Sequence, residues 1–118
     1  MTAQFDFSGL SGPHIAVLFA GLEPIVSRLQ AAGHRDAADV IVNASVALAA
    51  EAQSRADGSQ AFLVTVSLPL LDSMAMNELG ILERAARKSG QHPASGLFWI
   101  PLADACLEAL RARKAEMN

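Results

Sequence analysis

Apolar residues recur three or four positions apart along much of the chain, and the first such stretch lies between residues 13 and 33. Its apolar positions are Ile15, Leu18, Phe19, Leu22, Val26 and Leu29. This spacing is typical of an amphipathic helix. Pro24 interrupts it, because proline lacks the backbone N–H and crowds the preceding turn. We expect a helix from Gly12 to Gly33, with a kink near Gly21 or a restart at Glu23.

The second stretch is unusually rich in alanine, with eight alanines between Gly33 and Gly58. Alanine has the highest helix propensity, and its small side chain lets a neighbouring helix come close. We expect a second helix that is capped by Asp36, runs to about Ala56 and ends at the turn signal 57–59. Two helices of similar length joined by a tight turn predict an N-terminal helical hairpin.

Two further helices follow from the same spacing. The first runs from about Leu70 to Lys88 and ends at Gly90. The second begins at Pro101, the first helical position, and carries an apolar stripe. The stripe consists of Trp99, Leu102, Ala103, Cys106, Leu107 and Leu110. The sequence therefore predicts an all-α fold, a compact bundle of four to five helices in a single domain spanning 1–118, preceded by an N-terminal arm at 1–11.

Two segments leave an alternative open. Residues 61–67 contain the β-branched run Val64 to Val66, and 97–100 form a short apolar run after a predicted loop at 91–96. Runs this short are compatible with a strand or with a buried helix. The alternative is an α+β fold with two short strands near 62–66 and 97–100. Because two short strands make a marginal sheet, the N-terminal arm or a second copy would then complete it.

The amino-acid composition indicates which class of partner to expect. Of 118 residues, 52% are apolar and 18% are charged, so the chain has more apolar surface than one core needs. This favours a protein partner or a homodimer. The net charge of −3 and the lack of a long basic cluster argue against nucleic acid. Seven arginines against two lysines, together with the alanine content, indicate a bacterial origin.

Neither the N-terminus nor the apolar runs suggest a membrane or secreted protein. The start of the chain lacks a signal-peptide pattern, and no apolar run approaches the roughly 20 residues of a membrane-spanning helix. A single cysteine fits a reducing compartment. We therefore expect a cytoplasmic protein without a membrane span.

Candidate chemistry is sparse. The three histidines, His14, His34 and His92, have no second ligand at a metal-binding spacing. Cys106 lies on the apolar stripe of the last helix, where a small core side chain is expected rather than a reactive thiol. No catalytic, cofactor-binding or metal site is predicted, which favours a non-enzymatic protein.

Five residues are candidates for an interface. Phe98 and Trp99 are adjacent, so an extended segment would point one of them outward, and Phe5 and Phe7 lie on the N-terminal arm. Met76 points away from the apolar stripe of its helix. These residues suggest a helical protein–protein interaction module, acting as an adaptor, regulator or assembly subunit.

Two other functions remain as alternatives. One is a small-molecule-binding or catalytic domain with a pocket near His92 and Trp99. The other is a DNA-binding transcriptional regulator that uses Arg84, Arg87 and Lys88 or the basic turn near the C-terminus.

Overall fold

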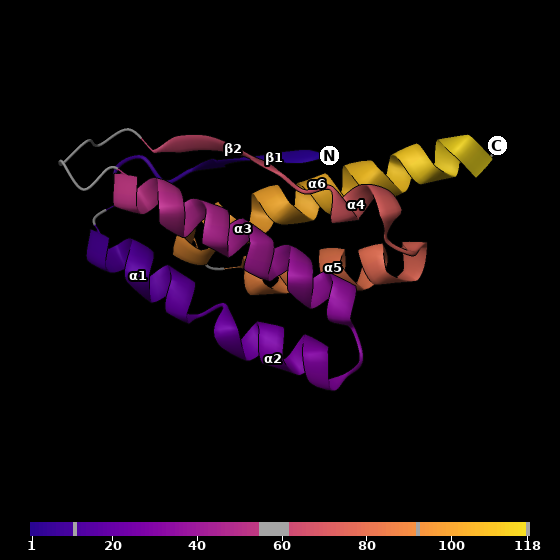
Figure 1. Cartoon of the computed structure of the whole chain (residues 1–118), viewed down its shortest axis with the longest axis horizontal. Helices are drawn as coiled ribbons and strands as arrows, with labels where there is room; N and C mark the ends of the chain where they lie inside the picture. The colour runs from indigo at the N-terminus through magenta and orange to yellow at the C-terminus, as the bar shows by residue number, and fades with distance from the viewer. Residues whose placement is uncertain (11, 55–61, 92, 118) are drawn as a thin grey trace.

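The fold is mainly helical with one small sheet. The computed structural model describes residues 1–10, 12–54, 62–91 and 93–117. The elements in chain order are β1 (Thr2–Asp6), α1 (Gly12–Ala20), α2 (Glu23–Ala31), α3 (Arg35–Ser54), β2 (Leu63–Ser67), α4 (Leu70–Ser73), α5 (Met76–Ser89) and α6 (Pro93–Met117). Figure 1 shows the sheet on one side, α3, α5 and α6 in the middle, and α1 and α2 on the opposite side. The predicted helical character is confirmed, but a purely all-α fold is wrong because β1 and β2 pair.

The N-terminal arm provides the second strand of the sheet. β1 and β2 are antiparallel, with Ala3 opposite Val66 and Phe5 opposite Val64. Ala3 and Phe5 face the core and their neighbours face solvent, as the two-residue period of a strand requires. The backbone N–H of Phe7 also donates to the Phe62 carbonyl at 2.8 Å. The alternative fold is therefore confirmed for the strand near 62–66.

The strand expected at 97–100 is wrong, because this segment lies inside α6. The predicted loop at 91–96 and the helix start at Pro101 are also wrong: α6 begins at Pro93 and Pro101 lies within it. Helical spacing brings Phe98, Trp99 and Leu102 together into the core. Their burial outweighs the hydrogen bond that Pro101 cannot make.

The N-terminal helices agree with the predicted hairpin. α1 ends at Ala20 and α2 restarts at Glu23, which places Pro24 in the first turn, where its missing N–H is not needed. α2 ends in a turn with Gly33 at φ +88°, and the His34 N–H donates to the Leu29 carbonyl at 2.8 Å. α2 and α3 then run antiparallel (Figure 1).

The limits of α3 differ in part from expectation. Asp36 lies in the first turn of α3 rather than before it. The predicted end at Ala56 and the turn at 57–59 lie outside the described residues.

The helix expected from Leu70 to Lys88 is divided into α4 and α5. Met74 and Ala75 separate them in extended conformations, with ψ of 148° and 146°. The end at Gly90 is confirmed. A Cβ on Gly90 would lie 2.9 Å from Ile100 Cδ1 and 3.0 Å from Trp99 Cβ, so a larger residue here would require α6 side chains to shift.

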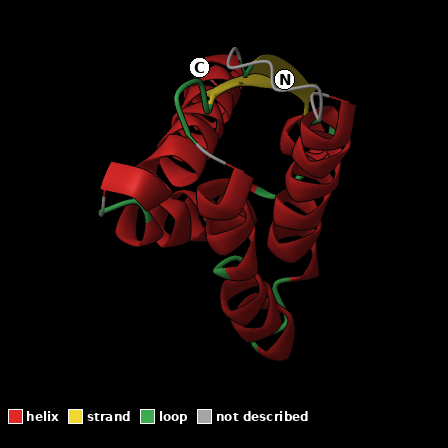
Figure 2. Cartoon of the chain, turned by 90° about the vertical axis from the view of Figure 1, so that its left-hand side faces the viewer, coloured by secondary structure: helices red, strands yellow, loops and turns green. Residues whose placement is uncertain are grey.

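The core is built around an aromatic cluster where the sheet meets α6. The Phe5 and Phe98 rings stack with centroids 5.6 Å apart, and Phe98 meets Trp99 edge-on at 4.9 Å. Phe7 continues the cluster to Phe62 at 5.3 Å. Figure 2 shows the strands lying across one side of the helices. The cluster therefore joins β1 to α6, which are far apart in the sequence.

Candidate functional site

Four of the five predicted interface residues lie in the core. Phe5, Phe7, Phe98 and Trp99 are buried, and Met76 is half-buried. The expectation that Phe98 and Trp99 point in opposite directions is wrong, because it assumed an extended segment and this segment is helical. The four aromatic residues thus stabilise the core of the folded chain and do not form an exposed interface.

The most apolar surface element is α1. It contains no Asp, Glu, Lys or Arg, and none of its residues from 13 to 20 is buried. Val17 exposes 73% of its surface, while Ile15, Leu18 and Phe19 are half-buried. An apolar helix that leaves so much of its surface in water is unusual for a folded protomer. α1 and α2 together form one layer of the molecule, here called the α1–α2 layer (Figure 1). Two grooves border this layer.

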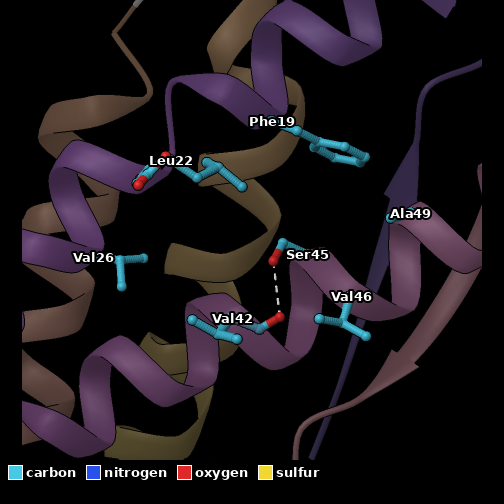
Figure 3. A pocket seen from close by; sticks show the side chains of 8 residues that line it. Phe19, Leu22, Val26, Val42, Ser45, Val46 and Ala49 are labelled. Atoms are coloured by element: carbon cyan, nitrogen blue, oxygen red, sulfur yellow. Dashed lines mark hydrogen bonds between the residues drawn. The ribbon is translucent and has the colours of Figure 1, made fainter.

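The first groove, here called the α3 groove, lies between α3 and the α1–α2 layer. Its volume is about 320 Å³. It is lined by Phe19, Leu22, Glu23, Val26, Val42, Ser45, Val46 and Ala49. Figure 3 shows Val42, Ser45 and Val46 along one side of α3, opposite Phe19, Leu22 and Val26. The Ser45 hydroxyl donates to the Val42 carbonyl at 2.8 Å, so it is already satisfied within the helix.

α3 has two apolar faces, which explains its composition. One face packs in the core and includes Ala37, Ile41, Ala44 and Leu48. The residues on the other face are Val42, Ser45, Val46 and Ala49, which repeat at the spacing of a helix-packing seam. Val46 nevertheless exposes 62% of its surface. This second face borders Phe19, Leu22 and Val26 of the α1–α2 layer across the groove, but they do not close over it, and Val42 and Val46 stay exposed.

The second groove, here called the α5–α6 groove, lies on the other side of the α1–α2 layer. Its volume is about 580 Å³. It is lined by Leu10, His14, Val17, Leu18, Gly21, Ile25, Ser89, Ser95 and Trp99. It continues into a space of about 460 Å³ lined by Ile25, Arg28, Leu29, Ala85, Lys88 and Ser89. Ile25 and Ser89 border both spaces, so the two spaces adjoin, and together they are called the α5–α6 groove, whose second space has a basic border.

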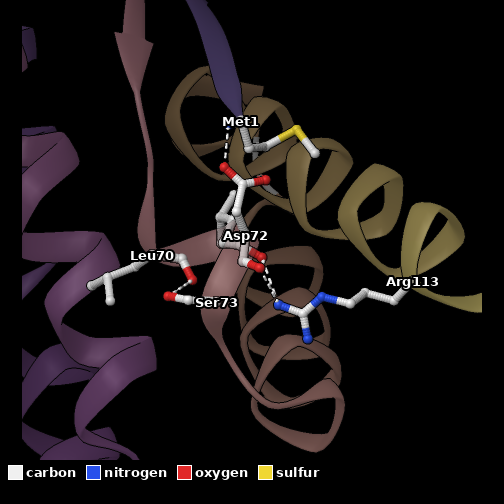
Figure 4. A network of polar contacts seen from close by, with 6 residues as sticks. Met1, Leu70, Asp72, Ser73 and Arg113 are labelled. Carbon is white, nitrogen blue, oxygen red and sulfur yellow. Dashed lines mark hydrogen bonds and ion pairs between the residues drawn. The ribbon is translucent and has the colours of Figure 1, made fainter. Parts of the chain in front are cut away.

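A network of polar contacts joins α4 to α6 and to the N-terminus of the chain. At the break after α4, the Arg113 guanidinium of α6 donates to the carbonyls of Leu71, Asp72 and Met74, with Nη2 2.7 Å from the Asp72 oxygen. The Asp72 carboxylate forms an ion pair with the Met1 amino group at 2.7 Å (Figure 4). The network satisfies carbonyls at the end of α4 and fixes the start of β1. Its role is structural.

One side-chain hydrogen bond joins the α2–α3 turn to α5. His34 Nδ1 and Glu78 Oε1 are 2.7 Å apart, and both side chains are largely shielded from solvent. The other carboxylate oxygen, Glu78 Oε2, is buried without a hydrogen-bond partner among the described residues. This pair fixes the position of the hairpin relative to α5.

The remaining candidate groups offer little chemistry. His14 lies at the rim of the α5–α6 groove, and His92 lies outside the described residues. Burial raises the pKa of the Cys106 thiol to about 12, which keeps it protonated and unreactive. In the described ranges, no three His, Cys, Asp or Glu side chains are placed to hold one metal ion. None of the described helices has both the length and the apolar character needed to cross a membrane.

Comparisons with protein-family models, with curated proteins and with solved structures find no match for this chain. The candidate sites therefore rest on the geometry of the chain itself. Sequence analysis missed Val17, Val42 and Val46 as surface residues. A signal was present for the last two, since the spacing of positions 42, 45, 46 and 49 forms a second apolar stripe on a helix that already has one.

Proposed function

We propose that this chain is a helical protein–protein interaction module that self-associates through the second apolar face of α3. The observation that carries the proposal is the seam of Val42, Ser45, Val46 and Ala49, which borders a groove and in which Val42 and Val46 stay exposed. Burying such a seam against a second helix removes apolar surface from water, which drives association. The adjacent apolar surface of α1 enlarges the area available for contact.

The charge distribution favours a second copy as the partner. Residues 40–50 of α3 and residues 12–22 contain no Asp, Glu, Lys or Arg. In a two-fold symmetric dimer the same patch occurs on both sides of the interface, so a charged patch would repel itself. Glu23, at the start of α2, is the charged residue among those that line the α3 groove, and the facing part of α3 is uncharged and therefore suited to self-contact.

The test is the molar mass in solution, measured by size-exclusion chromatography with light scattering over a range of concentrations. We expect wild-type protein to form a dimer. Val46→Glu should convert it to a monomer, because two-fold symmetry would place two carboxylates in one apolar interface. Since Val46 is mostly exposed in the protomer, circular dichroism should show an unchanged helical content.

Leu63→Glu is the matched control. Leu63 is another exposed aliphatic residue, with 53% of its surface accessible, but it lies on β2 and does not line the α3 groove. This variant should remain a dimer. A wild-type monomer at every concentration, or equal dissociation of both variants, would refute self-association through this face.

A further inference from the structure

The α5–α6 groove has two chemically different parts. Along most of its length the wall is apolar and is formed by Leu10, Val17, Leu18, Ile25 and Trp99. At the end between α2 and α5, Arg28 and Lys88 border it. No Asp or Glu is among the described residues that line either part. The groove thus changes from apolar to cationic along its course.

The two cations are available to a ligand. Within the described part of the chain, neither Arg28 nor Lys88 forms a hydrogen bond or an ion pair. Arg87, their neighbour on α5, differs in this respect, because it pairs with Glu83 at 2.9 Å and with Asp104 at 3.2 Å. The side chains at the groove are therefore positive charges without compensation, which attract an anion.

The size of the apolar part favours a small ligand over a helix of a partner protein. Its volume of about 580 Å³ lies within the usual range of small-molecule sites, roughly 300–1,000 Å³. A three-turn helix is about 10 Å across and about 16 Å long and fills more than roughly 1,000 Å³, so only one of its faces could enter the groove, whereas a small ligand can lie within it. An extended hydrocarbon chain fits the groove better.

We propose that the α5–α6 groove binds a single-chain amphiphile with an anionic head group, of the class of long-chain carboxylates. The hydrocarbon chain lies against Leu18, Ile25 and Trp99, and the carboxylate lies between Arg28 and Lys88. This inference goes beyond the proposed self-association and does not depend on it, because the α3 groove lies on the other side of the α1–α2 layer.

Trp99 supplies a direct readout, because it is the only tryptophan in the chain and it borders the groove. Dodecanoate, titrated below its micelle concentration, should bind the full chain at one molecule per protomer and change the Trp99 emission. Decanoate should bind more weakly, by about fourfold for each methylene removed. Dodecan-1-ol has the same chain without the charge, so we expect it to bind at least about tenfold more weakly than dodecanoate.

Variants of the protein test the contact with the anionic head group and the contact with the hydrocarbon separately. The double variant R28Q and K88Q should bind dodecanoate about as weakly as the wild type binds dodecan-1-ol, while its affinity for the alcohol stays the same. R111Q is the matched control, since Arg111 is an exposed cation of α6 that does not line the groove, and it should change neither affinity. V17D should weaken both ligands, because it places a charge in the apolar part.

Three results would overturn the proposal. The first is a lack of saturable one-to-one binding of dodecanoate to the wild-type chain. The second is an equal affinity for dodecanoate in the wild type and in the R28Q and K88Q double variant. The third is a loss of dodecanoate affinity in R111Q as large as that in the double variant. A synthetic acidic amphipathic peptide serves as the competing class of ligand. One-to-one binding of that peptide without binding of dodecanoate would assign the groove to a protein partner instead.

Discussion

α1 and the first half of α6 are similar in composition and opposite in environment. Residues 12–20 and residues 93–103 both lack Asp, Glu, Lys and Arg. In α6 this segment buries Phe98, Trp99 and Leu102, whereas in α1 no residue from 13 to 20 is buried. Exposed apolar surface thus lies on α1 at Val17, as it does at Val42 and Val46 of α3 and at Leu63 of β2. Composition alone therefore does not distinguish a helix that is buried in the core from one whose apolar side chains stay exposed.

The difference arises from what each helix packs against. α6 packs along α5 and also against β1 and α4, so its apolar side chains meet other side chains on several sides. α1 touches α6 only at a few positions and borders an open groove. Since the hydrophobic contribution scales with the area removed from water, α1 contributes much less to the stability of a single protomer.

The comparison is tested most strongly by removing one aromatic ring from each region. Phe98→Ala should lower the free energy of unfolding by about 3–5 kcal/mol, because it leaves a cavity between the Phe5 and Trp99 rings. Phe19→Ala is the matched control in α1, where the ring is half-buried and meets Phe7 at 6.3 Å. The free energy of unfolding that Phe19→Ala loses should be less than half of what Phe98→Ala loses. Urea denaturation followed by circular dichroism measures both, and equal losses would contradict the comparison.

The buried region should also respond to alkaline pH through Cys106. The pKa of its thiol is raised from 9.0 to about 12 mainly by burial, so the folded state keeps the proton that the unfolded state releases. The proton of this thiol therefore has no effect on the free energy of unfolding below pH 9, and that free energy decreases between pH 9 and 12, by roughly 1 kcal/mol at pH 10. The chain has no tyrosine to titrate in this range.

The Cys106 effect is measured as the change in unfolding free energy between pH 8 and pH 10. Cys106→Ala removes the titrating group, so its stability should change less over the same interval, whatever its stability at pH 8. A parallel change in both proteins would show that the thiol is accessible to solvent in the folded state.

Local patterns along the chain predicted most of the helices but not their long-range partners. The Schellman-type end at Gly33, the restart at Glu23 and the end at Gly90 follow from glycine and proline chemistry within a few residues. The break at Met74 has no such local signal. Its free carbonyls are satisfied by Arg113, which is about 40 residues away in the sequence.

The sheet shows the same limit. Val64 to Val66 indicated a strand, but the short run at 97–100 looked equally suitable as a second one. The actual partner is β1, whose Ala3 and Phe5 fill the core beside Phe98. For the candidate site, aromatic residues were expected on the surface because aromatics are common in interfaces. They were buried instead, since the largest apolar side chains gain most from the core of the protomer itself.

The smallest expected effect tests the exposed side of the comparison. Val17→Ser should change the unfolding free energy of the protomer by less than about 0.5 kcal/mol, because Val17 exposes 73% of its surface. Val40→Ser is the matched control: Val40 is 1% exposed, so the same substitution leaves a cavity and buries a hydroxyl, and it should cost about 2 kcal/mol or more.

The stability of Val17→Ser should be measured at several protein concentrations. At low concentration the protomer alone determines the result, and Val17→Ser should be nearly neutral. If a second copy covers α1 as well as the α3 groove, the wild type gains stability with concentration by mass action, and Val17→Ser should gain less. A cost at low concentration as large as that of Val40→Ser would mean that α1 packs within the protomer, and the contrast between α1 and α6 would no longer hold.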